Sequence, residues 1–512
     1  MPAKTLSGAV LGLEATPVEV EVDTISGQLH SFQIVGLPDA AVNESKERVN
    51  AAIRNAGGSP PQLSNRRIVV NLAPADIKKE GPVFDLPIAV AFLAASSQIP
   101  QESIAGNLFL GELSLDGRLR PTSGVLPVAL LAQKLKTPAI FVPQENVQEA
   151  AVASTTVFGV ANLNELVAHL RGQKVLTPQT PTDIDSFLRQ EEPGSHNLAY
   201  IRGQEHAKRA LEITAAGGHN ILMSGPPGSG KTMLAKALRT ILPPLFKDEC
   251  LEISKIFSVA GLLNKEKPLV LQRPFRHPHH TASAVAVVGG GTHPKPGEIT
   301  LAHRGVLFLD EFPEFHRDVL EALRQPLEDC QITVARATGT LNFPADFILV
   351  AAMNPCPCGH KTNPHKDCVC SPGQVHKYKR KISGPLLDRI DLHLEVPLIK
   401  YDKLAAERVS EDSHGVLQRV IRARQKQLSR LAADGLRTNS QMGVLEMKKY
   451  CQLLPDAAAI LKNAVDTLHL SARSYHRLLK VARTIADLED QPVILSQHLA
   501  EALQYRPRED EF

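Results

Sequence analysis

The stretch that decides the fold is Gly225-Pro226-Pro227-Gly228-Ser229-Gly230-Lys231-Thr232, and it directly follows an apolar run at 220–224. Its glycines let the backbone wrap closely around an anion, and a helix expected at 233–239 turns its N–H groups and positive dipole end toward the same point. We expect Lys231 to reach the β- and γ-phosphates of a nucleotide and Thr232 to hold Mg²⁺. A glycine-rich turn without a ligand is the alternative, but the flanking strand and helix argue against it. The pattern therefore predicts a nucleotide-binding α/β domain in which every residue of the stretch contributes to binding.

Length and composition place broad limits on the chain. With 512 residues, of which 43% are hydrophobic, it can form sizeable cores and about three or four domains. Its 57 Lys and Arg residues nearly balance its 54 Asp and Glu residues, so a nucleic-acid surface would have to be a local basic patch. No apolar run approaches the roughly 20 residues of a membrane span, and the N-terminus lacks the apolar core of a secretory signal. We therefore expect a cytoplasmic protein without a membrane partner.

Four parts follow one another along the chain. Residues 1–170 alternate short β-rich runs with helical patterns, which predicts a separate α+β or α/β domain. The polar, proline-punctuated stretch 171–197 is typical of a linker with one short helix. Residues 198–398 alternate strands and helices around an expected parallel sheet. The remainder, 399–512, has helical patterns rich in Leu, Ala and Arg.

Polar residues follow two apolar runs of the nucleotide-binding part. The run 305–309 has the pattern of a buried strand and leads to Asp310 and Glu311. Ligands bind at the carboxyl ends of strands in such sheets, so we expect Asp310 to support Mg²⁺ and Glu311 to orient the attacking water. A second run, 347–352, leads to Asn354, whose amide would lie near the γ-phosphate at the same edge. One carboxylate in such a place can be a helix cap, but the phosphate loop upstream favours hydrolysis.

The combination of phosphate loop, Asp-Glu pair and strand-end Asn resembles the AAA+ ATPases. This resemblance implies ATP and Mg²⁺ as cofactors, a catalytic role for Lys231, and the sensor 1 role for Asn354. The stretch 383–391 resembles the motif that offers an arginine to the nucleotide of a neighbouring subunit, which here is Arg389 and implies a ring. A salt bridge from Arg389 to a nearby aspartate, at 388 or 391, is the alternative.

A further arginine lies in the helical part. The stretch 471–479 resembles the sensor 2 helix of the magnesium-chelatase and replicative-helicase branch of AAA+ proteins, and the resemblance implies the sensor 2 role for Arg473. Arg477 lies one helical turn later on the same face, so the pattern does not separate the two. Either arginine could be only a surface cation.

A β-hairpin pattern at 331–341 lies between the two strands that carry these polar residues. It resembles the hairpin that projects into the pore in the same AAA+ branch, and Arg336 stands where a phosphate-contacting cation is expected. Our hypothesis is that Arg336 and Lys295, in the glycine-rich loop 289–297, contact a nucleic-acid backbone. A surface hairpin arginine without a partner is the alternative.

Four of the seven cysteines are clustered as two pairs, Cys356 with Cys358 and Cys368 with Cys370. In a reducing compartment such a cluster indicates either a metal or plain thiols. Two pairs across a turn-rich loop could close a tetrahedral zinc site. Structural zinc motifs usually place two or more residues between paired cysteines, however, and only one lies between each pair here. Zinc and four reduced thiols therefore both stay open.

Histidines provide further candidates for metal ligands. His360 and His365 lie in the cysteine loop and could substitute for a thiolate. A second cluster, at 276–281, holds three histidines, but adjacent histidines diverge in a strand and no carboxylate completes a ligand set. For this cluster we expect hydrogen bonding or a role in a substrate loop.

Motifs along the whole chain occur in the order found in the YifB/ComM proteins, the Mg-chelatase-like AAA+ family that this sequence resembles. The resemblance implies an AAA+ P-loop core at 198–398, a C-terminal helical lid at 399–512, and a hexameric, ATP-driven DNA helicase. It also implies branch migration during homologous recombination in natural transformation, with a homo-hexamer as the assembly and single-stranded or branched DNA as the partner. The matching stretches are 35–39, 203–205, 217–220, 278–280, 297–303 and the cysteine pairs.

The first domain, through 81–90 and 111–118, resembles the peptidase domain of Lon. Where Lon-type peptidases carry the serine nucleophile this chain has Val83, and where they carry the lysine base the alignment places Leu126. A valine side chain cannot attack a carbonyl, so the Ser-Lys mechanism is absent. We expect this domain to support subunit packing or DNA binding.

Two other functions compete with the DNA motor. A chelatase-type motor would use the same ATPase site to drive metal insertion through a partner subunit, but the chelatase ATPase subunit lacks the Lon-like extension. A nucleotide-gated scaffold without turnover would need Glu311 or Arg389 to be non-catalytic. The DNA motor is therefore the leading hypothesis.

Overall fold

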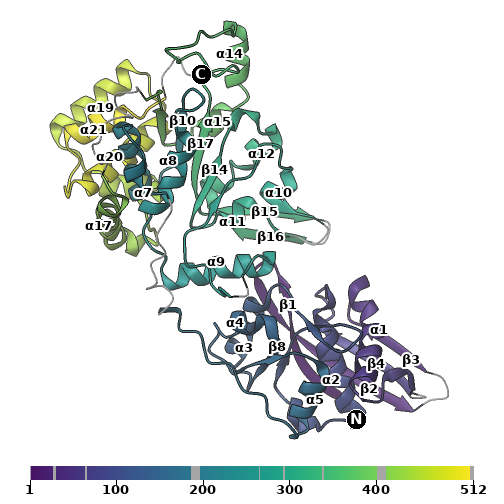
Figure 1. The fold of residues 1–512 in the computed structure, drawn as a ribbon. Coiled ribbons are helices and arrows are strands. Elements are labelled where there is room, and N and C mark those ends of the chain that lie inside the picture. The colour runs from purple at the N-terminus through teal and green to yellow at the C-terminus, as the bar shows by residue number, and fades with distance from the viewer. Residues whose placement is uncertain are drawn as a thin grey trace. The chain divides into compact units, whose positions relative to one another are not determined.

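The protein forms two compact units in this computed structural model, and each is described by itself (Figure 1). The first unit comprises Met1–Gln190 and Phe246–Leu271, and the second comprises Glu191–Leu245 and Gln272–Phe512. The structure describes residues 2–26, 30–63, 66–185, 196–264, 266–291, 295–336, 339–399 and 411–507.

A seven-stranded mixed sheet forms the first unit. β1 pairs with β2 and β2 with β4 in antiparallel fashion, whereas the other pairings are parallel. Buried and more exposed residues alternate along β4, as expected for a strand with one covered face. In sheet order the strands are β3 (Ser31–Val35), β4 (Arg66–Ala73), β2 (Glu14–Ser26), β1 (Ala3–Leu11), β5 (Leu108–Phe109), β8 (Ile140–Pro143) and β9 (Val157–Val160).

Helices complete the core of this unit. α2 (Asp85–Ala95) is apolar and almost entirely buried, and it contacts β1, β2 and α1 (Ala40–Asn55). α3 (Val125–Leu135) packs on the same strands and also contacts α9 (Lys247–Ala260), which is why the later segment belongs to this unit. Two shorter helices, α4 (Val147–Ala150) and α5 (Leu163–Leu170), pack beside β9.

The second unit contains a five-stranded, wholly parallel sheet. Its central strands are short, apolar and buried, the pattern that helices on both faces of a sheet require. In sheet order the strands are β11 (Phe275–Arg276), β14 (Val306–Leu309), β17 (Ile348–Met353), β10 (Ile221–Ser224) and β18 (Leu392–Glu395).

Helices of the second unit share one hydrophobic core with this sheet. α7 (Glu205–Gly217) contacts α8 (Lys231–Leu238) and β18, and the C-terminal helices α17 and α20 pack against α7. Figure 1 shows these C-terminal helices, in yellow and light green, beside α7 and α8. They are α17 (Ser413–Leu431), α18 (Val444–Tyr450), α19 (Pro455–Thr467), α20 (Ala472–Leu488) and α21 (Ser496–Leu503). Other helices of the second unit are α10 (Ala284–Val288), α11 (Glu298–Leu301), α12 (Arg317–Ala322), α13 (Pro326–Asp329), α14 (Pro372–Lys379) and α15 (Gly384–Leu387).

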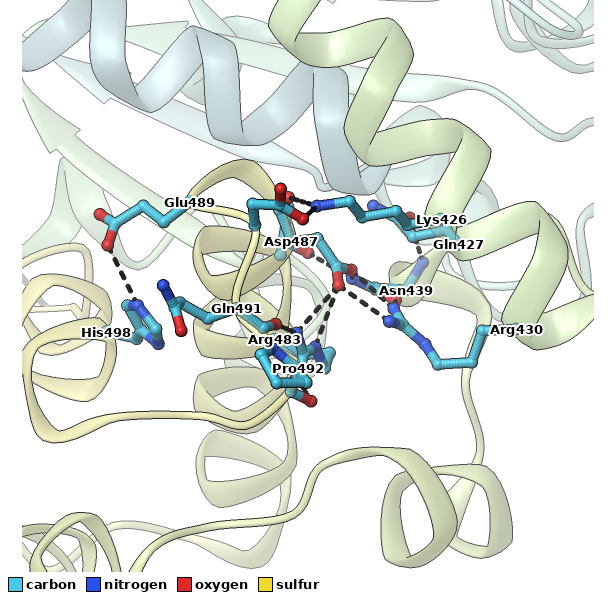
Figure 2. A network of polar contacts seen from close by, with 12 residues as sticks. Lys426, Gln427, Arg430, Asn439, Arg483, Asp487, Glu489, Gln491, Pro492 and His498 are labelled. Atoms are coloured by element: carbon cyan, nitrogen blue, oxygen red, sulfur yellow. Dashed lines mark hydrogen bonds and ion pairs between the residues drawn. The ribbon is translucent and has the colours of Figure 1, made fainter.

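A buried polar network joins the C-terminal helices (Figure 2). Asp487 of α20 accepts hydrogen bonds from Arg430 of α17 at 2.6 and 2.8 Å and from Arg483 at 3.0 and 3.2 Å. The Asn439 amide donates to the same carboxylate at 2.8 Å. The side chains of Asp487 and Arg483 are each 1% exposed. Burial removes the water that would solvate their charges, so each charge is stabilised by its partner instead.

The observed elements agree with the coarser part of the fold prediction, a mixed α/β chain with a parallel sheet, while the Lon-like first domain and the helical lid stay predictions. The expected strands at 305–309 and 347–352 overlap β14 and β17, and the expected helix at 233–239 overlaps α8 (Lys231–Leu238). The mixed α/β fold with a parallel sheet in the second unit is therefore confirmed. Boundaries of the four predicted parts stay predictions, and Phe246–Leu271, which lies inside the predicted ATPase core, belongs to the first unit. Within the described ranges, no helix combines the length and the apolar character needed to cross a membrane.

Candidate functional site

Three neighbouring strands of the second unit deliver the predicted site residues to one edge of the sheet. Ser224, the last residue of β10, pairs in register with Met353, the last residue of β17. On the other side of β17, Leu309 at the end of β14 pairs with Ala351. The phosphate loop, Asn354 and the Asp-Glu pair therefore leave the sheet next to one another, at the carboxyl ends of parallel strands.

Two glycines of the phosphate loop lie at positions where a side chain would clash or would strain the backbone. A Cβ atom on Gly225 would lie 2.2 Å from the main-chain oxygen of Val396, so a side chain does not fit there. Gly230 has a φ of 91°, in the left-handed region that favours glycine, and it precedes the first residue of α8. The loop thus directs the N-terminus of α8, with its N–H groups and positive dipole end, into its own concave side.

Lys231 places its ammonium group inside the loop. Its Nζ donates to the carbonyl oxygens of Gly225 at 2.7 Å and Pro226 at 3.0 Å, and to Oδ1 of Asn354 at 3.4 Å. Lys231 is 8% exposed, and burial lowers the pKa of its ammonium group. Lys231, which is predicted to bind phosphate, and Asn354, the predicted sensor 1 residue, therefore contact each other.

Thr232 and Asp310 are also brought together. The Thr232 hydroxyl donates to Oδ2 of Asp310 at 3.0 Å, and the other carboxylate oxygen accepts from the Glu311 N–H at 2.9 Å. Hydroxyl and carboxylate oxygens are the ligands that Mg²⁺ prefers, and Mg²⁺ usually takes one or two protein ligands beside phosphate oxygens. The pair fits the predicted magnesium site.

Glu311 has a partner that the sequence analysis did not identify. Its Oε2 lies 2.8 Å from Nδ1 of His280, a member of the histidine cluster for which hydrogen bonding was expected. A second member, His279, contacts the Thr281 hydroxyl at 2.8 Å. The two residues meet because the cluster follows β11, and β11 pairs with β14, the strand that leads to Glu311. Sequence periodicity carries no information on strand order, so this pair could not be predicted.

Arg389 lies in a different group of contacts. Its Nη1 donates to the Pro385 carbonyl at 2.8 Å, and its Nη2 forms an ion pair with Glu328 of α13. The partner is thus Glu328, rather than the aspartates at 388 and 391 considered from sequence. Glu328 is distant from Arg389 in the chain, and no sequence pattern indicated that the two residues pair. The guanidinium side chain is 14% exposed, while that of Glu328 is 60% exposed.

Geometry separates the two arginines of α20 that the sequence did not. Arg477 is mostly buried and donates to the carbonyls of Leu387 at 3.2 Å and Ile390 at 2.5 Å, which flank Arg389 in the chain. Arg473 is 58% exposed in its side chain and lies 3.8 Å from Asp388. Arg477 therefore supports the backbone of the loop around Arg389, and Arg473 is the arginine with an accessible guanidinium group.

The predicted nucleic-acid contacts lie on two hairpins. The expected hairpin is confirmed as β15 (Gln331–Arg336) and β16 (Gly339–Pro344), which pair in antiparallel fashion. Arg336 ends β15, and its side chain lies outside the described part of the structure. Lys295 is exposed on β13 (Lys295–Pro296), which pairs with β12 (Gly289–Gly290).

The four clustered cysteines converge. Their sulfur atoms all lie within 4.8 Å of one another, and three of the Sγ–Sγ separations are 3.4, 3.6 and 3.6 Å. A tetrahedral zinc site with bonds of about 2.3 Å needs sulfurs about 3.8 Å apart, so the donor set fits this metal. Among the described residues, no histidine joins this group of ligand atoms. The converging residues are Cys356, Cys358, Cys368 and Cys370.

The cysteine loop also touches the nucleotide site. A Cβ atom on Gly359 would lie 2.7 Å from Cδ of Pro227 and 3.8 Å from Cγ of Asn354. Cys356, which is buried, follows Asn354 by two positions. The loop that carries the thiols thus approaches the phosphate loop so closely at Gly359 that this position has no room for a side chain.

The two positions at which the resemblance to Lon places the peptidase dyad lie in the first unit. Val83 packs against the hydrophobic core, and Leu126 of α3 is fully buried. The Leu126 N–H donates to Oε1 of Glu149 at 2.9 Å, and the same oxygen accepts from the Ser258 hydroxyl of α9 at 2.5 Å. Burial raises the pKa of Glu149 despite these bonds. This buried carboxylate links α3 to α9 within the first unit.

Comparisons with known proteins connect this geometry to a family. The family described as "Magnesium chelatase, subunit ChlI" matches residues 197–404. The family described as "Subunit ChlI of Mg-chelatase" matches residues 20–146, and "Magnesium chelatase, subunit ChlI C-terminal" matches residues 410–506. Together these matches cover both units.

Curated relatives match over nearly the full length. "Competence protein ComM" of Haemophilus influenzae is 45% identical over 504 residues, which cover 98% of this chain and 96% of that protein. "Uncharacterized protein YifB" of Escherichia coli is 44% identical over 500 residues, 97% of this chain and 96% of that protein. The "Magnesium-chelatase 67 kDa subunit" of Heliobacterium mobile is 28% identical over 31% of this chain and 28% of its own length. The chain belongs to the YifB/ComM family, whose second unit is a magnesium-chelatase-like AAA+ domain.

Proposed function

We propose that this protein is a cytoplasmic, ATP-driven DNA motor that promotes branch migration during homologous recombination in natural transformation. The observation that carries the proposal is the meeting of Lys231, Asn354 and the Thr232–Asp310 pair at one sheet edge. Membership of a magnesium-chelatase-like AAA+ family supports ATP hydrolysis, and the similarity to a competence protein supports a role in natural transformation.

Each residue of the site has a task in hydrolysis. Lys231 neutralises the β- and γ-phosphates, and Asn354 beside it orients the γ-phosphate. Thr232 and Asp310 would hold Mg²⁺, which supplies positive charge for the phosphate oxygens. Glu311 orients the attacking water. Phosphoryl transfer needs mainly charge neutralisation and alignment, so this set is sufficient within one subunit except for one cation supplied in trans.

That trans cation, Arg389, comes from the adjacent subunit of a homo-hexamer in this proposal. Arg389 belongs to a separate contact group with Glu328, which supports donation to another subunit's nucleotide. Arg473, the exposed arginine near Asp388, is the sensor 2 candidate. Arg477 holds the loop around Arg389 in place through its hydrogen bonds to main-chain carbonyls.

DNA would contact the two hairpins of the second unit, β15–β16 and β12–β13. Arg336 at the end of β15 and the exposed Lys295 on β13 would contact phosphates of single-stranded or branched DNA. The first unit, with Val83 and Leu126 where a Lon-type peptidase has its dyad, would serve subunit packing or DNA binding rather than proteolysis. Its Lon-like character remains part of the proposal.

Zinc is proposed as a structural cofactor at the four-cysteine cluster, on the strength of the sulfur spacing. Elemental analysis of purified wild-type protein should find about one zinc per chain. Cys358→Ala should lower this content, whereas Cys330→Ala, a matched change of a half-buried cysteine outside the cluster, should not. Equal zinc content in the two variants would contradict the assignment.

The test of the function is hydrolysis of ATP with and without forked DNA. Wild type should hydrolyse ATP faster when DNA is present, and Lys231→Ala should abolish turnover. Lys236→Ala is the matched control, because Lys236 is an exposed lysine on the same helix, α8. Wild-type hydrolysis that does not respond to DNA would contradict the motor proposal.

A chelatase-type motor is the second candidate, favoured by the matches to magnesium-chelatase subunits. It would use the same ATPase site to drive metal insertion through a partner subunit. ATP-dependent metallation of a porphyrin in the presence of a chelatase partner subunit, without any response to DNA, would favour it over the DNA motor.

A further inference from the structure

The stretch Gly217-Gly218-His219-Asn220 lies between α7 and β10, at the amino end of the parallel sheet. β10 pairs with β18 on one side, where Ile221 is opposite Leu392, and with β17 on the other side. The stretch therefore lies beside residues 389–391, which lead into β18 and begin with Arg389. The phosphate loop leaves β10 at the opposite, carboxyl edge of the sheet.

Asn220 fixes the main chain of the segment that contains Arg389. Its main-chain oxygen accepts hydrogen bonds from the N–H groups of Asp391 and Leu392, both at 3.0 Å. Its side-chain Nδ2 donates to the carbonyl oxygen of Arg389 at 3.2 Å, while Oδ1 accepts from the Leu349 N–H of β17 at 2.8 Å. One amide side chain thus joins the main chain at Arg389 to a central strand of the sheet.

His219 joins the same segment to the C-terminal helices. Its ring is fully buried, with Nδ1 3.0 Å from Oδ2 of Asp391 and Nε2 2.8 Å from the Thr484 hydroxyl of α20. An ionised carboxylate can only accept, so Nδ1 carries the proton that points toward Asp391. Thr484 also accepts from Asn439, which donates to Asp487 in the network of Figure 2. His219 therefore connects the segment that carries the trans arginine to a buried network on α20.

Gly217 leaves the space that the His219 ring occupies. A Cβ atom at Gly217 would lie 2.2 Å from Cδ2 and Nε2 of His219 and 2.6 Å from the Thr484 hydroxyl oxygen. A side chain at this position would therefore push the ring away from Thr484. The glycine is thus required for the contact between His219 and α20.

The main chain around Arg389 is held from two sides. The stretch 217–220 bonds to it from the sheet, and Arg477 donates to two carbonyls of the same loop from α20. The Arg389 side chain, in contrast, forms its ion pair with Glu328, whose side chain is 60% exposed. The guanidinium group can therefore exchange this carboxylate for a phosphate while the main chain stays fixed.

We infer that His219 and Asn220 are positioning residues that hold the main chain at Arg389 where its guanidinium group reaches the nucleotide of the neighbouring subunit. Both lie at the amino end of the sheet, so they act on the neighbour's reaction rather than on the phosphate loop of their own subunit. The inference rests on the proposed function, because it requires that Arg389 acts in trans.

The test uses Asn220→Ala, which removes only the side-chain bonds of a partly buried residue, together with His219→Ala. Both should lower kcat by about 10- to 100-fold, the scale of a displacement of about 1 Å in a positioned group. Binding of a fluorescent ATP analogue should equal that of wild type, because the phosphate loop is unchanged. His219→Asn, whose amide can take the place of Nδ1–H, should keep more activity than His219→Ala, and the exposed control His414→Ala should match wild type.

Mixed rings show on which side of the subunit interface the change acts. An Asn220→Ala subunit keeps an intact phosphate loop, so it can use the Arg389 of a Lys231→Ala neighbour. Equal amounts of these two proteins should recover about 25% of wild-type phosphate release, since about one interface in four is complete. Equal amounts of Asn220→Ala and Arg389→Ala should show no such recovery, because neither protein donates a well-placed arginine.

Wild-type kcat in Asn220→Ala and His219→Ala would overturn the inference. Recovery with Arg389→Ala in place of Lys231→Ala, or recovery with neither, would also overturn it. The mixture of Lys231→Ala with Arg389→Ala separates this inference from the proposed function. If that mixture recovers activity and Asn220→Ala with Lys231→Ala does not, only the positioning role fails, whereas no recovery in that mixture contradicts the shared site itself.

Discussion

Mixing two inactive variants should restore part of the ATPase activity if Arg389 serves a neighbouring subunit. Arg389→Ala alone should lower kcat by about 10³, the scale of a lost trans arginine. Lys231→Ala alone should also be inactive. In rings assembled from equal amounts, about one interface in four joins an intact Lys231 to an intact Arg389 from its neighbour, so the mixture should recover about 25% of wild-type hydrolysis if interfaces act independently.

The ion pair of Arg389 provides the control for this experiment. Glu328→Ala removes its partner, whose side chain is 60% exposed. Because the Glu328 carboxylate is mostly in solvent, which screens the pair, its loss should cost about 0–1 kcal/mol, and folding and hydrolysis by Glu328→Ala should both stay near wild type. Hydrolysis is measured by phosphate release at a fixed total protein concentration after co-assembly. A mixture no more active than either variant alone, or full activity in Arg389→Ala, would refute the shared site.

Three other predictions address the framework of the second unit. Gly225→Ala should abolish binding of an ATP analogue, because its Cβ would lie 2.2 Å from a main-chain oxygen, whereas Gly373→Ala, which meets nothing within 4 Å, should bind normally. Asp487→Ala leaves two guanidinium groups without their carboxylate and should lower the free energy of unfolding in urea by about 3–5 kcal/mol, and equal midpoints in Asp487→Ala and the exposed control Asp490→Ala would count against this. Burial lowers the pKa of His393 to about 3, below its ordinary value near 6.5. Its contribution to stability is therefore complete above pH 6.5 and is lost as the pH falls toward 3, by up to about 1.4 kcal/mol per pH unit. Urea titrations at pH 7 and pH 5 should show that the free energy of unfolding depends less on pH in His393→Leu than in wild type. An equal dependence in the two proteins would argue against the lowered pKa of His393.

Local patterns predicted the strand ends of the site well. The apolar runs before Asp310 and Asn354 are buried strands whose length and composition mark them without knowledge of their neighbours. The phosphate loop required a glycine that cannot bear a side chain, and the sequence has one at 225. Because parallel strands release their carboxyl ends at one edge, these local predictions sufficed to place Lys231, Asp310 and Asn354 together.

Contacts between distant segments could not be predicted in the same way. The pairing of His280 with Glu311 depends on β11 lying beside β14, and that of Arg389 with Glu328 depends on the packing of α13. Arg473 shares a helix face with its neighbour one turn later, and only the main-chain carbonyls of another segment distinguish them. Hydrophobic periodicity reports the burial of a segment but not the identity of what covers it.

Strand displacement from a branched DNA substrate is the decisive measurement for the proposed DNA motor. The full-length protein with ATP and Mg²⁺ should separate a labelled strand from a forked or four-way DNA, and omission of ATP or the change Lys231→Ala should abolish this. Lys236→Ala should unwind as wild type does. A wild-type protein that hydrolyses ATP but leaves every branched substrate intact would contradict the DNA-motor account.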